Sequence, residues 1–252
     1  MANSFDFLLR WVILGMAYLP VVSCLFCVIW TVLTKSSLVY AAAMTDCPES
    51  SFFPTVSVSI GPWEPQRLVW IASMLIHAPM RICVTVLYPT VWPHGKLRTS
   101  LQIALICEAI ATLLVCVFHV QSIAGEAMHA VCFTFWSFAT GATMLITITL
   151  HKMYGRDNMD SKLAIFGFFL LFALTCASAH PFSTTYCYKW VYAIFCLSEY
   201  ALMISSAAFW VSVINSLSLH FDRISISLCK SSQEQMLSTL ESSFTCIVDD
   251  KV

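Results

Sequence analysis

The chain has 252 residues, of which 59% are hydrophobic and 11% are charged, and its mean hydropathy is +0.79. Soluble domains average about 45–50% apolar and about 25% charged residues, so this composition excludes a soluble globular protein and predicts an integral membrane protein. The net charge of −1 gives no indication of a nucleic-acid partner or of a polybasic lipid-binding patch.

Six apolar stretches are long enough to cross a bilayer as helices, which takes about 20 residues each. They are Trp11–Leu33, Leu68–Val91, Ser100–Ser122, Met128–Leu150, Leu163–Ala179 and Trp190–Leu217. We therefore expect an all-α membrane domain with six transmembrane helices over residues 1–217, followed by a flexible Ser-rich tail over 218–252. The first stretch exceeds the roughly 7–15 apolar residues of a cleavable signal, so we expect it to be retained as a span.

The distribution of Lys and Arg in the short loops predicts the orientation of these helices. With Arg81 inside the membrane, nine of the 13 basic residues fall on one side and three on the other. The nine are Arg10, Lys96, Arg98, Lys152, Arg156, Lys162, Arg223, Lys230 and Lys251, and the three are Lys35, Arg67 and Lys189. Because cytoplasmic loops are enriched in Lys and Arg, both termini are expected in the cytosol and the loop 34–67 in the lumen.

The first span contains a C-x-x-C spacing, Cys24 and Cys27, in apolar surroundings. A redox or zinc role needs a polar setting that stabilises thiolates, so we interpret these two residues as small core residues. In the loop that follows, the alternation of Val and Ser over Thr55–Ile60 predicts a short strand.

Two cysteines, Cys47 and Cys187, stand in the predicted lumenal loops, and they are the only such pair among the 12 cysteines of the chain. In an oxidising compartment two thiols on facing loops are expected to form a disulfide. The alternative is that both remain free.

The second span carries His77 and Arg81, which are four residues apart and therefore share one helix face. Ionisable groups at this depth are costly in lipid and usually face a protein interior or a wet cavity. Pro79 between them removes a backbone donor and frees a carbonyl for such a polar pocket.

Acidic residues in other spans could accompany this pair. At a rise of about 1.5 Å per residue, His77 and Glu199 both lie roughly 14 Å below the lumenal surface, and Arg81 and Glu108 are level within roughly 3 Å. Depth therefore permits two pairs, Arg81 with Glu108 and His77 with Glu199, and sequence does not decide whether their helices are neighbours.

Several stretches of the chain resemble the Frag/DRAM/Sfk family of six-span membrane proteins, within it most closely the members that act in lipid remodelling of GPI anchors. The residues that carry the resemblance are Pro54-Thr55-Val56-Ser57, Ile60-Gly61, Pro65-Gln66-Arg67, Val69-Trp70, His77 with Arg81, Glu108, His129, Tyr186-Cys187, Val191-Tyr192, Ile194-Phe195 and Glu199-Tyr200. The family places its proline directly before the arginine, whereas here Pro79 lies two residues before Arg81.

The resemblance implies a multi-pass protein of the Golgi or endoplasmic reticulum membrane that acts in fatty-acid reacylation during GPI-anchor maturation. It implies membrane lipid and GPI-anchored proteins or lyso-GPI intermediates as partners, and it is compatible with catalysis or with an accessory role beside an acyltransferase partner.

Under the first hypothesis the candidate catalytic residues are His77, Arg81 and His129, with a histidine as general base and Arg81 opposing developing negative charge. Further candidates for a binding or structural polar pocket are Glu108, Glu199, Arg67 and Gln66. Under the second hypothesis the protein binds or presents lipid without catalysis, and the same charged side chains hold the helices together or bind phosphate.

A channel or transporter is the third alternative, but the polar residues needed to line a path to the cytosol are sparse. The sequence contains no phosphate-binding loop, serine elbow or metal-ligand spacing. We therefore expect no metal and no cofactor.

Overall fold

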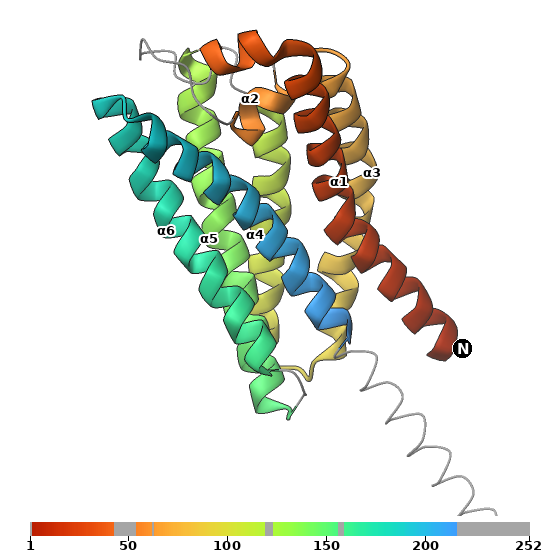
Figure 1. The fold of residues 1–252 in the computed structure, drawn as a ribbon. Helices are drawn as coiled ribbons and strands as arrows, with labels where there is room; N and C mark the ends of the chain where they lie inside the picture. Colours follow the sequence, from red (N-terminus) through yellow and green to blue (C-terminus); the bar gives the residue numbers. More distant parts are fainter. Residues whose placement is uncertain (1, 43–53, 62, 119–122, 156–158, 216–252) are drawn as a thin grey trace, which may run out of the picture.

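The computed structural model of the chain describes residues 2–42, 54–61, 63–118, 123–155 and 159–215, and all regular structure in these ranges is helical (Figure 1). The elements in chain order are α1 (Ala2–Ala42), α2 (Val56–Ile60), α3 (Gln66–Leu87), the 3₁₀-helix η1 (Tyr88–Val91), α4 (Lys96–Val117), α5 (Ile123–Met153), α6 (Met159–Tyr186) and a last helix at Lys189–Asn215. Six helices in the described ranges are long and apolar enough to cross a membrane. The predicted all-α class and the six predicted spans are therefore confirmed, whereas the tail predicted over 218–252 lies outside the described residues.

The long helices form one bundle in which chain neighbours pack together: α1 with α3, α3 with α4, α4 with α5, and α5 with α6. The last helix runs diagonally across this bundle in Figure 1 and contributes Phe209, Trp210 and Val213 to the main hydrophobic core. The short helix α2 packs on α1 and α3 at the end of the bundle opposite the N-terminus. Large apolar side chains remain exposed on the outside, as expected of helices that face hydrocarbon.

The fifth span does not end at Ala179, so this predicted boundary was wrong: α6 continues through Pro181 to Tyr186. Proline removes one helical hydrogen bond, the one to the carbonyl of Ala177, and the helix nevertheless continues. In the next turn Ser183 Oγ and Thr184 Oγ1 donate to His180 O at 2.8 and 3.1 Å. The predicted 17-residue stretch would also have been shorter than a bilayer core of about 30 Å at about 1.5 Å per residue. The length needed to cross the bilayer therefore decides where this helix ends, and the proline does not.

The strand predicted over Thr55–Ile60 was also wrong, because Val56–Ile60 forms the helix α2. Thr55 caps this helix, its side chain accepting a hydrogen bond from Val58 N at 3.0 Å. Val56, Ser59 and Ile60 are buried, which is the i, i+3, i+4 pattern of a helix face. A helix also satisfies its own backbone groups, which a lone strand without a partner cannot do.

A second, smaller hydrophobic cluster lies beneath α2 and joins it to α1 and α3. Its buried members are Cys24, Cys27, Val56, Ile60, Trp70 and Met74. Both cysteines are free and almost fully buried, so the interpretation of the C-x-x-C spacing as core packing is confirmed.

One buried ion pair fastens the middle of the bundle. Arg81 Nη2 on α3 forms a salt bridge with Glu108 Oε1 on α4, and their side chains are 7% and 0% exposed. Thr140 on α5 donates to the same Oε1 at 3.1 Å, and Arg81 Nη1 contacts Met16 Sδ on α1 at 3.3 Å. The predicted Arg81–Glu108 pair is thus confirmed, and its contacts involve four helices.

Replacing Arg81 alone is expected to destabilise the protein strongly. Arg81→Met leaves the buried carboxylate of Glu108 without its cation, which typically costs about 3–5 kcal/mol. The double variant Arg81→Met/Glu108→Gln removes both charges and should recover most of this loss. Thermal melting in detergent, followed by size-exclusion chromatography, measures both variants. Equal melting temperatures for wild type and Arg81→Met would contradict a structural role for the pair.

Candidate functional site

The short helix α2 is held by side chains from α1 and the last helix. Thr31 Oγ1 on α1 donates to Ser59 O at 3.0 Å. From the last helix, Glu199 Oε2 accepts from Val56 N at 3.1 Å and Tyr200 OH donates to Pro54 O at 2.7 Å. Each of these bonds satisfies a backbone group of the segment, so α2 sits in a fixed position.

The start of α3 is joined to the same network. Gln66, fully buried, donates from Nε2 to Thr31 Oγ1 at 2.9 Å, and Cys27 Sγ contacts Gln66 O at 3.3 Å. Gln66 therefore links α3 to the residue of α1 that holds α2.

The fixed helix presents Ser57 to a histidine on α5. Ser57 Oγ and His129 Nε2 are 2.6 Å apart, and His129 Nδ1 lies 2.6 Å from the carbonyl oxygen of Phe118. Phe118 follows the end of α4 in an extended conformation, so its carbonyl is not committed to helical bonding. A carbonyl only accepts, so Nδ1 carries the proton, and in the neutral ring Nε2 accepts the hydroxyl proton of Ser57.

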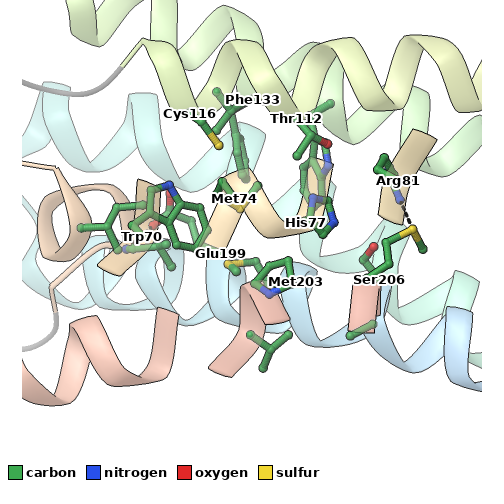
Figure 2. A pocket seen from close by; sticks show the side chains of 18 of the residues that line it. Trp70, Met74, His77, Arg81, Thr112, Cys116, Phe133, Glu199, Met203 and Ser206 are labelled. Atoms are coloured by element: carbon green, nitrogen blue, oxygen red, sulfur yellow. Dashed lines mark hydrogen bonds between the residues drawn. The ribbon is translucent and has the colours of Figure 1, made fainter. Parts of the chain in front are cut away.

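A cavity of about 120 Å³ lies on one side of this Ser57–His129 pair, between α1, α3, α4 and the last helix. Figure 2 shows Trp70, Met74, His77 and Arg81 following one another along this cavity, at the spacing of one face of α3. Glu199 and Met203 line it from the last helix. The cavity is thus mostly apolar, with a few polar groups that converge on it.

A larger cavity of about 690 Å³ lies on the other side, between α5, α6 and the last helix. This volume is within the range of small-molecule sites, which are also mostly apolar. Its lining includes Phe138, Leu145 and Leu174, which are exposed on the outside of the bundle at 74%, 52% and 70%. The larger cavity therefore reaches the surface of the bundle that faces hydrocarbon.

The two cavities share a border. Ser57, His129, Phe133 and Glu199 line both of them. A hydroxyl group with a histidine acceptor thus stands where two apolar cavities meet, close to one end of a transmembrane bundle.

The model of the Frag1/DRAM/Sfk1/Cwh43P N-terminal domain matches residues 8–220. The chain belongs to this family. It is 28% identical over 210 residues to acyltransferase PGAP2 of Xenopus tropicalis, in an alignment that covers 77% of this chain and 82% of that one. It is 22% identical over 209 residues to post-GPI attachment to proteins factor 2 of Caenorhabditis elegans, with coverages of 76% and 78%. No solved structure matches the chain.

Among the candidate catalytic residues of this Frag1/DRAM/Sfk1 member, His129 lines both cavities, whereas His77 and Arg81 line the smaller one. His77 is buried and contacts the backbone of Met16. The residue four places after Met16 is Pro20, which cannot donate to its carbonyl, so the partner for His77 arises from the proline in α1 rather than from Pro79.

The structure does not join His77 to Glu199, although both line the smaller cavity. The hydrogen bond that the structure gives Glu199 is to Val56 N, and no ion pair or hydrogen bond between His77 and Glu199 occurs in the described part of the chain. The prediction from depth thus holds for their shared cavity, but the two side chains do not form a pair.

The remaining pocket candidates lie away from the two cavities. Glu108, Gln66 and Arg67 do not line either of these two cavities. Glu108 is engaged by Arg81 and Gln66 by Thr31, while Arg67 is half-buried at the start of α3. The charge of Arg81 is correspondingly matched by Glu108, which favours a structural role over a role in opposing charge on a substrate.

Ser57, which lines both cavities, was not among the site residues predicted from the sequence. It belongs to the stretch that carries the family resemblance, but a strand prediction gave it no distinct environment. The burial of positions 56, 59 and 60, which sets Ser57 apart from Ser59, is a property of the folded helix, because the alternation of Val and Ser alone places both serines on one face.

Cys187 is disulfide-bonded, whereas Cys47 lies outside the described residues. The Cys47–Cys187 bond therefore stays a prediction. No group of three or more metal-ligating side chains occurs within the described ranges.

The hold of the last helix on α2 can be tested at Glu199. Glu199→Leu leaves Val56 N–H buried without an acceptor, which should lower stability by about 1–3 kcal/mol. Glu199→Gln keeps an accepting oxygen and should melt close to wild type. Thermal melting with limited proteolysis of the segment between α1 and α3 measures the difference. If the two variants were equally destabilised, a role for Glu199 as an acceptor for α2 would be wrong.

Proposed function

We propose that this protein acts in GPI-anchor maturation by transferring a fatty acyl group onto a membrane lipid, the reacylation step of lipid remodelling. The observation that carries the proposal is the Ser57–His129 pair at the border of two apolar cavities inside a transmembrane bundle. The names of two relatives, acyltransferase PGAP2 and post-GPI attachment to proteins factor 2, support the same pathway.

The site has a base and an apolar cavity, two of the features that acyl transfer uses. His129 Nε2 has a lone pair directed at a hydroxyl and acts as general base, while Nδ1 is held by Phe118 O. The larger cavity is lined by apolar side chains and reaches the outer surface, so it suits a fatty acyl chain that enters sideways from the bilayer. The polar residues at its border are placed to meet the ester end of that chain.

The lipid-binding alternative without catalysis is favoured by one observation, the neutralised Arg81–Glu108 pair. Under this alternative the cavities hold a lyso-GPI lipid and present it to a separate acyltransferase. Purified protein that binds the lipid but transfers no acyl group from any donor would support this alternative.

We further propose that the α2 end of the bundle faces the lumen of the Golgi or endoplasmic reticulum. At that end the sequence has few basic residues, and the opposite end carries Arg10, Lys96, Arg98, Lys152 and Lys162. Cys187, at the junction of α6 and the last helix, is disulfide-bonded, and disulfides persist in oxidising compartments. Both observations favour cytosolic termini.

Removing the base is expected to abolish function in cells. In cells that lack the endogenous GPI reacylation factor, wild type should restore surface GPI-anchored protein and its remodelled lipid. His129→Ala should fail, because a positioned base contributes about 10²–10⁴-fold to rate. Flow cytometry and mass spectrometry of the released lipid are the measurements.

The matched control for this experiment is His94→Ala, which removes an exposed histidine near the start of α4, at the other end of the bundle. It should restore function like wild type. Full restoration by His129→Ala, at equal expression and with a monodisperse elution profile, would remove His129 from the mechanism.

The orientation can be tested by glycosylation. None of Asn3, Asn158 and Asn215 is followed two residues later by Ser or Thr, so the chain has no acceptor sequence of its own. An acceptor sequence inserted between α1 and α2 should be glycosylated, and one inserted between α5 and α6 should not. A gel shift removed by endoglycosidase measures this, and the reverse pattern would overturn the proposed orientation.

A further inference from the structure

We propose that Ser57 is a covalent acyl acceptor, so that transfer proceeds in two displacements through an acyl-Ser57 ester. This inference rests on the proposed acyl-transfer function and adds the residue that carries the acyl group. Its substrates are an activated fatty acyl ester as donor and a lyso-lipid hydroxyl as acceptor.

The first support is the arrangement of three groups in a line. Ser57 Oγ, the ring of His129 and Phe118 O are joined by two contacts of 2.6 Å each. A hydroxyl, a base and a third group that orients the base form the general pattern of an activated nucleophile. Here the orienting group is a backbone carbonyl, which holds the tautomer in which Nε2 is the acceptor.

The second support is the contrast between two serines of the same short helix. Ser59 is fully buried, donates its hydroxyl to Thr55 O at 2.9 Å and lines neither of the two cavities. Ser57 is half-buried, lines both cavities and meets His129. The fold therefore directs one hydroxyl into the scaffold and the other toward the space that a substrate would fill.

The third support is the immobility of the backbone around Ser57. Backbone groups of Pro54, Val56 and Ser59 are bonded to side chains of Tyr200, Glu199 and Thr31. A nucleophile held in this way has little orientational freedom to lose at the moment of attack.

The first displacement acylates the enzyme. Ser57 Oγ attacks the acyl carbonyl of the donor, and His129 Nε2 takes the hydroxyl proton. The new Oγ–C bond forms, the bond from the carbonyl carbon to the donor's sulfur or oxygen breaks, and the leaving group takes the proton from His129.

The second displacement regenerates the serine. The hydroxyl of the lyso-lipid attacks the acyl-Ser57 carbonyl while His129 accepts its proton. The Oγ–C bond breaks and Ser57 Oγ recovers the proton. The two steps sum to a transesterification, with no change of oxidation state and no further reactant.

The test traps the intermediate on the purified full-length protein. Wild type is incubated with a radiolabelled fatty acyl thioester or with phosphatidylcholine labelled in its acyl chain, without acceptor, and is then denatured. Neutral hydroxylamine removes any label from cysteine thioesters, and alkali-labile label is mapped by peptide mass spectrometry. The two donors distinguish a thioester source from a lipid ester source.

We expect alkali-labile label on Ser57 with one of the donors, and its discharge when a lyso-lipid is added. Ser57→Ala should lose the label and at least about 100-fold of the transfer rate. Ser178→Ala, which removes an exposed serine of α6 outside both cavities, should keep both. Ser57→Cys should move the label into the fraction that neutral hydroxylamine removes, and it reports on a folded protein if Ser57→Ala does not fold.

The outcomes separate this inference from the proposed function. Transfer by wild type with no label on residue 57, or near wild-type transfer by Ser57→Ala, would overturn the covalent role and leave acyl transfer standing as a single displacement. Folded wild type that transfers from neither donor would overturn the acyl-transfer proposal and the acyl-serine with it.

Discussion

The structure depends on satisfying the backbone of a short helix that lies within a membrane bundle. Polar backbone groups without water must find partners in the protein, and a five-residue helix leaves most of its own terminal groups unpaired. Thr31, Glu199 and Tyr200 supply these partners from two long helices. The same bonds that make α2 tolerable in the bundle also hold Ser57 at His129, so stability and geometry of the site have one origin.

The buried ion pair of the bundle is separate from the Ser57–His129 pair. Arg81 and Glu108 neutralise one another at the centre of the bundle, and Thr140 donates to the carboxylate oxygen that Arg81 binds. Arg81 nevertheless lines the smaller cavity. Because Glu108 pairs with it, the cavity borders a neutral ion pair rather than an unpaired cation. The Ser57–His129 pair is consequently left to work with neutral groups and with the single carboxylate of Glu199 at the border of both cavities.

Composition and the length of the apolar stretches were sufficient for the helical class and the six spans, because length in a bilayer is nearly a one-dimensional property. Depth permitted the Arg81–Glu108 pair and the His77–Glu199 pair equally, and only the packing of the helices decides that the first forms. Sequence patterns were insufficient for α2 and for the end of α6, where local alternation and a proline suggested the opposite of what the membrane setting requires. The partner of His129 was out of reach for another reason. Ser57 and His129 are 72 residues apart in the chain, and only packing of α2 against the bundle brings them together.

The position of α2 at one end of the bundle has a consequence for which lipids can react. A bilayer lipid keeps its ester bonds near its own headgroup, and spontaneous movement between leaflets would require the headgroup to cross hydrocarbon. In the proposed reaction Ser57 therefore meets the esters of only one leaflet, whatever lipids the opposite leaflet contains. The position of the site in the membrane would thus select lipids by leaflet, without any recognition of the headgroup.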